Sequence, residues 1–175
     1  MKMLETKRLI IQAPIQADLP HYVELHMHPD VRKLMYTRAK DIEQIQDWLS
    51  ASIEHQKKHG FCVGTVFDKA AGNFIGRAGL ARIEEGHADI DGIAIDCYLL
   101  PAYWRNHYAL EILKACFTWG FNQLALDKIV ATVYSINLPA QKLAENAGMK
   151  FIGNHMYDEE EFMWYEIIKG CKKEA

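Results

Sequence analysis

Two pairs of histidines have a spacing that suggests metal chemistry. His55 and His59 stand four residues apart in H-Q-K-K-H, and His26 and His28 form H-x-H. Either spacing can place two imidazoles on one zinc ion, but no third ligand accompanies them, and the first pair lacks the glutamate of a metalloprotease helix. We therefore expect surface histidines and no metal site.

The four cysteines add no ligand set. They are far apart and include no C-x-x-C pair: Cys62, Cys97, Cys116 and Cys171. This spacing matches neither a zinc ribbon nor a redox motif. We expect reduced, mostly buried thiols.

Carboxylates in the segment ADIDGIAID are candidates for proton transfer. Asp89, Asp91 and Asp96 fall within or next to an expected strand, and Tyr134 ends a later one. A positioned carboxylate can act as a general base and a phenol as a general acid. We take Asp96 as the candidate base and Tyr134 as the candidate acid. A solvated aspartate on the exposed face of a strand is the alternative for Asp96.

The segment Arg105-Asn106-His107-Tyr108-Ala109 opens a strongly helical stretch that covers residues 108–121. The unpaired N–H groups and the dipole at a helix N-terminus favour phosphate binding. Arg105 can donate bidentate hydrogen bonds to a phosphate, and His107 can add a charge-assisted one when protonated. We expect a phosphate contact here. The alternative is that both side chains are simply solvated.

The elements that position these residues follow from periodicity and turn signals. Strands are expected at 8–13, 61–69, 73–83, 88–100, 127–136, 150–157 and 161–169, and helices after Asp18, at 41–59, at 108–121 and after Asn137. Asp18 stands at an N-cap position, and Gly60 and Gly148 stand at helix ends. Short turns make residues 60–98 antiparallel, whereas the crossover through 108–121 makes the next strand parallel. The predicted fold class is α+β, with a mixed, mostly antiparallel central sheet and helices on both faces.

Composition limits the classes of partner. The 175 residues are 50% hydrophobic, which suits one domain spanning 1–175. The net charge of -3 gives no reason to attract nucleic acid or an anionic membrane. The first 14 residues lack a signal-peptide run, so we expect a cytoplasmic protein. A small molecule or a protein is the expected partner, and the chain is a monomer or homodimer.

Six segments spread over nearly the whole chain carry a family resemblance. They are LETKRLIIQ, HPDVRKLM, GNFIGRAGL, PAYWRNHYALEIL, YSINLPAQKLAENAGMKFIG and the aromatic closing strand EFMWYEIIK. In this order they resemble the GNAT superfamily of acetyltransferases, and more closely its branch of ribosomal-protein N-terminal alanine acetyltransferases. Gln12 stands where that branch has arginine.

The resemblance implies acetyl transfer from acetyl-coenzyme A to a primary amine, by direct attack in a ternary complex. The amine would be a protein N-terminus or a small molecule. The pyrophosphate would lie on residues 105–109. The pantetheine arm would pair, like an added strand, with the strand that diverges from the next one, at Cys97, Tyr98, Leu99 and Leu100. Main-chain N–H groups there can hold the oxyanion. Asn137 would contact the cofactor or order the catalytic site near the thioester, and it is equally suited to be a helix N-cap. Lys142 would contact the cofactor as well.

Several positions depart from the family pattern. The pyrophosphate loop usually reads W-G-x-G-Y-A, but Arg105 and His107 replace both glycines, and we expect a wider loop or weaker cofactor binding. The glutamate, serine and tyrosine that relatives use in proton transfer are replaced by Ala94, Ala140 and Ala144. Positioning of a neutral amine can still supply much of the barrier reduction. A catalytically impaired binding or regulatory protein is the alternative function.

Overall fold

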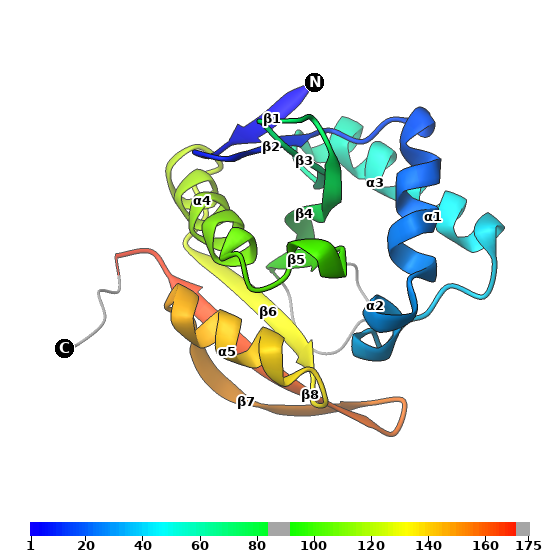
Figure 1. Ribbon diagram of the computed structural model, residues 1–175. Coiled ribbons are helices and arrows are strands. Elements are labelled where there is room, and N and C mark those ends of the chain that lie inside the picture. Colours follow the sequence, from blue (N-terminus) through cyan, green and yellow to red (C-terminus); the bar gives the residue numbers. More distant parts are fainter. Residues whose placement is uncertain (84–91, 171–175) are drawn as a thin grey trace.

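A single eight-stranded sheet forms the centre of the computed structural model, which describes residues 1–83 and 92–170 (Figure 1). The strands are β1 (Lys2–Glu5), β2 (Leu9–Gln12), β3 (Val63–Asp68), β4 (Phe74–Arg82), β5 (Ile93–Leu99), β6 (Lys128–Tyr134), β7 (Lys150–Tyr157) and β8 (Glu160–Ile168). Their spatial order is β1-β2-β3-β4-β5-β6-β8-β7. Neighbours are antiparallel except β5 and β6, which are parallel as the helical crossover predicts.

Five α-helices accompany the sheet in the described part of the chain. They are α1 (Leu19–Met27), α2 (Pro29–Leu34), α3 (Ile42–His59), α4 (Tyr108–Asn122) and α5 (Leu138–Ala147). The α+β prediction is confirmed. Analysis of the sequence missed β1 and α2, which are only four and six residues long. No helix in the ranges 1–83 and 92–170 is long and apolar enough to cross a membrane.

Helices cover both faces of the sheet, as Figure 1 shows for α4 and for α1 with α3. On one face α4 buries its apolar stripe, which includes Ile112, Leu113, Cys116 and Phe117. On the other face α1 and α3 pack through Tyr22, Ile45 and Leu49, which are fully buried. The central strands β4 and β5 are therefore held from both sides, which fixes the side chains that they present.

The residues expected at the ends of α1, α3 and α5 lie at the predicted cap positions. Gly60 ends α3 and Gly148 ends α5, both in the left-handed conformation. Asp18 precedes α1 as expected, but its side chain does not cap the helix. Its Oδ2 atom instead accepts hydrogen bonds from the Ile15 N–H (3.1 Å) and the Thr65 hydroxyl (2.7 Å). Asp18 is therefore the N-cap residue of α1, as predicted, while its carboxylate joins the turn before α1 to β3.

His55 has a structural role in place of metal binding. Its Nε2 atom accepts the Arg82 N–H (3.1 Å), so Nδ1 carries the proton that is donated to the Phe61 carbonyl (2.7 Å). The side chain thus ties α3 to the start of β3 and the end of β4. Among the described residues, no group of three or more His, Cys, Asp and Glu side chains is arranged to hold a metal ion.

Glu111 joins the first turn of α4 to the turn between β1 and β2. Its Oε1 atom accepts the Thr6 hydroxyl (2.6 Å) and the Arg8 N–H (3.0 Å), and Oε2 accepts Arg8 Nε (2.7 Å). The Arg8 guanidinium also lies 4.1 Å from the centre of the Tyr108 ring. Burial disfavours the charged carboxylate, but the hydrogen bonds from Thr6 and Arg8 outweigh it and lower the pKa of Glu111. One carboxylate therefore fixes the position of the α4 N-terminus.

We expect Glu111→Gln to reduce the free energy of unfolding by about 2 kcal/mol at pH 7, because charge-assisted hydrogen bonds to a partly exposed arginine are lost. The folded-state pKa lies below the ordinary value of 4.5. The difference between wild type and variant should therefore be complete above that value and shrink as the pH falls below it. Urea unfolding at several pH values measures this difference. A difference that does not change with pH would contradict the ion pair.

Candidate active site

The parallel strands β5 and β6 separate along their length. Their pairing is registered at one position, Ala94 with Val130, whereas β4 and β5 pair continuously from Arg82 with Ile93 to Gly76 with Leu99. Beyond Ala94 the edge of β5 that faces β6 is therefore free of a strand partner. A small cavity of about 80 Å³ lies in this gap. Its walls come from β5, β6, α4 and α5: Ile95, Asp96, Cys97, Tyr98, Leu113, Ala131, Thr132, Val133, Tyr134, Asn137, Ala140, Leu143, Ala144 and Met149.

A much larger cleft of about 750 Å³ adjoins the same gap. Aromatic side chains from α3, β5, β6 and the β7–β8 hairpin are prominent in its lining, together with Arg77, Arg82, Asp96 and Asp158. The two cavities share five lining residues: Ile95, Asp96, Tyr98, Thr132 and Tyr134. The gap between β5 and β6 is thus the place where a group in the small cavity can meet a group in the large cleft.

The loop before α4 keeps a left-handed backbone without glycine. Arg105 has φ = 61° and His107 has φ = 59°, a region that costs a residue with a Cβ atom roughly 1–2 kcal/mol. The Trp104 indole N–H donates to the Leu99 carbonyl (2.7 Å) and ties the loop to the end of β5. We expected the loss of the glycines to widen the loop. Arg105 and His107 instead adopt the left-handed conformation that glycine favours, so the substitutions do not force a wider loop.

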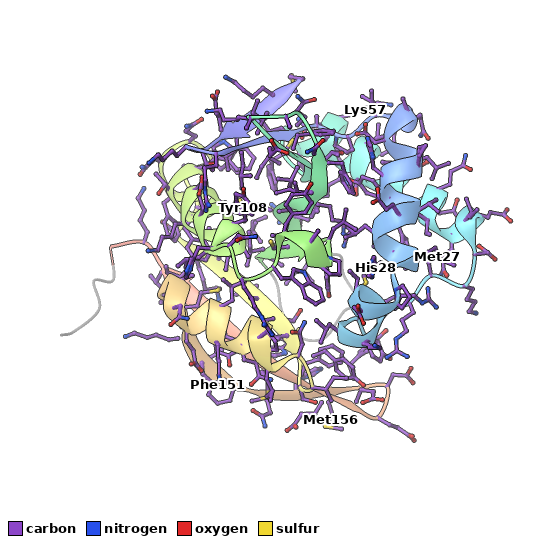
Figure 2. The ribbon with its side chains drawn as sticks, in the orientation of Figure 1. Met27, His28, Lys57, Tyr108, Phe151 and Met156 are labelled. Carbon is purple, nitrogen blue, oxygen red and sulfur yellow. The ribbon has the colours of Figure 1, made fainter. Side chains whose placement is uncertain are left out.

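The N-terminus of α4 is open to solvent. His107 is the N-cap, makes no side-chain cap, and is exposed together with Arg105 and Asn106. The first hydrogen bond of the helix runs from the Glu111 N–H to the His107 carbonyl (3.1 Å), which leaves the N–H groups of the preceding turn without helical partners. Figure 2 labels Tyr108 at this end of the helix. The arrangement suits an anion.

Residues 8–150 match the acetyltransferase (GNAT) domain family. The chain belongs to the GNAT family. It is 28% identical to the uncharacterized protein YkkB of Bacillus subtilis (strain 168) over 123 residues, which are 70% of each chain. Its fold is similar to that of spermidine N-acetyltransferase from Vibrio cholerae, solved with coenzyme A and spermine (TM-score 0.74, 18% identity, covering 92% of this chain and 95% of that one).

The comparisons do not single out the ribosomal-protein branch. A ribosomal-protein-S5-alanine acetyltransferase from Vibrio fischeri has a TM-score of 0.75 at 16% identity, covering 97% of both chains. The likeness to the spermidine enzyme is of similar strength. These structures therefore share the fold with this chain, and the acceptor has to be argued from the site.

In this GNAT domain Asp96 forms an ion pair with Arg77 of β4. Burial disfavours the charge on Arg77, but Asp96 outweighs it and the pKa of Arg77 is raised. The Arg77 guanidinium also lies 5.7 Å from the Tyr98 ring centre. Sequence reasoning did not select Arg77, although an arginine in the otherwise apolar run FIGRAGL was a signal. Asp96 lies at the gap with one oxygen held by Arg77, and its role as a base stays a prediction.

Tyr134 also lies at the gap, but its hydroxyl is engaged. It donates to Glu160 Oε2 (2.9 Å), and this hydrogen bond raises the pKa of Tyr134. The phenol therefore keeps its proton at neutral pH. Asp89 and Asp91, the other acidic candidates, lie outside the described residues.

Asn137 is the N-cap of α5, as one of its two predicted roles requires. Its Oδ1 atom accepts the Ala140 N–H (3.2 Å), and its Nδ2 donates to the Leu34 carbonyl (3.3 Å) at the end of α2. The side chain is buried and lines the small cavity. Lys142 is exposed on the same helix, which packs beside α4. Contact of either residue with a cofactor stays a prediction.

His26 is the exception among the histidines that were expected at the surface. It is 1% exposed, and neither ring nitrogen has a hydrogen-bond partner among the described residues. Its ring packs against Trp48 of α3 (5.2 Å between centres), which removes it from solvent. Burial, with the nearby charges of Arg77 and Arg32, lowers the pKa of His26 to about 3. A neutral imidazole therefore lines the large cleft.

We expect His107→Gly to change the free energy of unfolding by less than about 0.5 kcal/mol, because relief of the left-handed strain is offset by the freedom of glycine in the unfolded chain. His107→Val should lower it by about 2 kcal/mol, since a β-branched residue is an outlier at positive φ. Asn106→Val is the matched control in the same exposed loop. Equal unfolding curves for the two valine variants would mean that position 107 does not need the left-handed conformation.

Proposed function

We propose that this GNAT protein transfers an acetyl group from acetyl-coenzyme A to a primary amine by direct attack in a ternary complex. The observation that carries the proposal is the gap between β5 and β6, where the small cavity and the large cleft meet. A donor on the α4 side and an amine in the cleft can both reach Asp96 and Tyr134 there. The spermidine enzyme with the same fold was solved with coenzyme A.

The donor would use three parts of the protein. The free edge of β5, from Cys97 to Leu100, would pair with the amide groups of pantetheine as an added strand does. The open N-terminus of α4, with residues 105–109, would hold the pyrophosphate through N–H groups and the Arg105 guanidinium. Asn137 and Lys142 of the adjoining helix would complete the contacts. Acetyl-coenzyme A supplies the thioester that the amine attacks.

The protein would promote the reaction chiefly by position and by hydrogen bonding. The amine nitrogen forms a bond to the thioester carbonyl carbon, the C–S bond breaks, and the sulfur leaves as a thiolate. Main-chain N–H groups on the free edge of β5 would stabilise the negative charge that develops on the carbonyl oxygen. Confinement of both reactants in one gap lowers the entropic part of the barrier.

Proton transfer falls to Asp96 and Tyr134 in this proposal. The incoming amine must lose a proton, and Asp96 is the carboxylate that both cavities share. Tyr134 keeps its proton at neutral pH, and its hydroxyl would turn from Glu160 to donate that proton toward the departing sulfur. Arg77 would position Asp96 through the ion pair.

The alternative is a GNAT-fold protein that binds a ligand without turnover. Ala94, Ala140 and Ala144, at the positions where relatives have proton-transfer groups, favour it. The acceptor in the enzymatic case is a protein N-terminus or a small-molecule amine. We also propose one domain acting as a monomer or homodimer in the cytoplasm; the free thiols of Cys62, Cys97 and Cys116 suit a reducing compartment.

The pyrophosphate site is tested by the double variant Asn106→Glu/His107→Glu. Two carboxylates at the helix N-terminus should weaken acetyl-coenzyme A binding by about tenfold or more through repulsion of the phosphates. Asn106→Gln/His107→Gln is the uncharged control and should bind nearly as wild type. Calorimetric titration with acetyl-coenzyme A, coenzyme A and 3′-dephospho-coenzyme A gives the affinities. Equal affinity of both double variants would exclude the proposed phosphate site.

Catalysis is tested separately by thiol release with a panel of amines and peptide N-termini. Acetylation of any amine at a rate that Asp96→Asn reduces supports the enzyme. Tight binding of acetyl-coenzyme A without transfer to any acceptor favours the binding protein. Failure to bind at millimolar concentration would contradict both the donor site and the reaction.

A further inference from the structure

Four aromatic rings form a continuous surface in the large cleft, which we name the aromatic wall: Tyr36, Tyr134, Tyr157 and Phe162. Tyr36 follows α2, and the other three rings lie at the ends of β6, β7 and β8 that adjoin the β7–β8 turn. The Tyr36 ring centre lies 5.1 Å from that of Phe162, 5.8 Å from that of Tyr134 and 6.0 Å from that of Tyr157. Ring contacts thus bring the segment after α2 against the ends of β6, β7 and β8, which are distant from it in sequence.

Two hydroxyls of the wall, those of Tyr36 and Tyr134, are directed at carboxylates. Tyr36 donates to Asp158 Oδ2 (2.7 Å), as Tyr134 does to Glu160. The bond to Asp158 raises the pKa of Tyr36 to about 12, so the phenol stays a donor at neutral pH. Donation to a carboxylate increases the electron density of a phenol ring, and the faces of electron-rich rings attract cations. The wall therefore offers ring faces, with two negative charges at its edge.

The turn that carries these carboxylates has an unusual backbone. Asp158 and Glu159 have φ = 50° and 64°, the left-handed pair typical of a two-residue hairpin turn, although neither is glycine. Such strain persists where the surroundings hold it. Here the contacts of Asp158 with Tyr36 and of Glu160 with Tyr134 hold both sides of the turn against the wall.

The arginines that line the cleft are Arg77 and Arg82, and neither belongs to the wall. Arg82 ends β4 opposite Ile93, at the start of β5. Arg77 is paired with Asp96 at the gap. Arg38, a positive group near Tyr134, has its Nε atom directed at the carbonyl oxygens of Arg32 (2.8 Å) and Met35 (3.2 Å). A cation that enters the cleft therefore finds carboxylates beside the wall, from Asp158 and Glu160, and arginines on the β4 side.

We propose that the aromatic wall, with Asp158 and Glu160, binds a cationic group of the acceptor that is distinct from the reacting amine. The inference rests on the proposed amine acetylation. The reacting nitrogen must be uncharged at the gap, whereas a group on the wall stays charged. The acceptor class is then an amine with a second positive centre, an ammonium, quaternary ammonium or guanidinium.

The cation site is tested first without any acyl donor. Choline and its uncharged carbon analogue, 3,3-dimethylbutanol, have the same shape and differ in charge. The protein should bind choline at least about fivefold more tightly than the uncharged alcohol, as cation–π attraction at a partly exposed site predicts. Calorimetry measures both affinities. Equal affinity for the two compounds would overturn the proposal and identify the wall as a merely apolar surface.

Variants locate the site on the wall. Phe162→Leu and Tyr36→Leu should each weaken choline binding about threefold to fivefold, and Tyr36→Phe, which keeps the ring but loses the bond to Asp158, by about twofold. Phe151→Leu, at a half-exposed position on the outer strand β7 (Figure 2), is the control and should not change it. Thermal unfolding identifies any variant that fails to fold. If a leucine variant does not fold, the affinity of Tyr36→Phe, which keeps the ring, tests the site instead. Unchanged affinity in folded Phe162→Leu would overturn the proposal.

Transfer is measured last, with two acceptors of the same shape: 4-aminobutyl-trimethylammonium, and 5,5-dimethylhexylamine, which lacks the quaternary charge. The trimethylammonium acceptor should have the larger kcat/KM, and Tyr36→Leu should remove most of that difference by lowering only the value for the trimethylammonium acceptor. Acetylation of both amines at equal rates overturns the cation site while the proposed function stands. Preference for choline without any acetylation supports the cation site and contradicts the proposed function instead.

Discussion

The separation of β5 from β6 is the constraint on which the site depends. Two parallel strands that paired along their full length would satisfy each other's main-chain groups and close the sheet. Here the pairing is registered only at Ala94 with Val130. Each strand is held on its outer side instead, β5 by β4 and β6 by β8, through continuous antiparallel ladders. The sheet can therefore stay open at its centre without losing the order of either half.

The same two halves carry the chemistry on their inner edges. Asp96 and Tyr98 come from the half that contains β4, which adds Arg77 to the cleft. Tyr134 comes from the half that contains β8, which adds the β7–β8 hairpin. Asn137 links α5 on one half to the end of α2 on the other through its bond to the Leu34 carbonyl. By joining the two halves, this buried amide helps to fix the distance between β5 and β6.

Much of the fold could be predicted from local sequence patterns, because its main helices and strands are long and have clear start and stop residues. The helix from Ile42 to His59 ends at a glycine, and Tyr108 begins the next long helix. The elements that escaped prediction, β1 and α2, are too short to show a period, and β1 is ordered by pairing with β2 and by the bonds of Glu111 to Thr6 and Arg8. Tertiary contacts of this kind leave no signal in a single sequence.

The site was predictable only in outline. Residues 105–109 were recognisable as a helix start, yet the left-handed conformation of Arg105 and His107 contradicts their residue types. Asp96 and Tyr134 could be chosen for their chemistry, but not their partners Arg77 and Glu160, which depend on strand register. The burial of His26 was also missed, because it depends on the packing of α3 over α1, which a single sequence does not reveal.

Backbone strain marks both ends of the site. Five residues with a Cβ atom have positive φ in the described part of the chain, and four of them are Arg105, His107, Asp158 and Glu159. The first pair opens the helix proposed to hold the donor phosphates, and the second forms the turn behind the aromatic wall. Strained conformations persist only where surrounding contacts outweigh their cost. The Glu111 ion pair supports the helix at the first end, and the phenol–carboxylate bonds support the turn at the second. The loop before α4 keeps the left-handed backbone that glycine favours, although Arg105 and His107 stand at the positions where the family usually has glycine. The path of the backbone there is therefore maintained independently of the side chains, and the two substitutions add polar groups without changing that path.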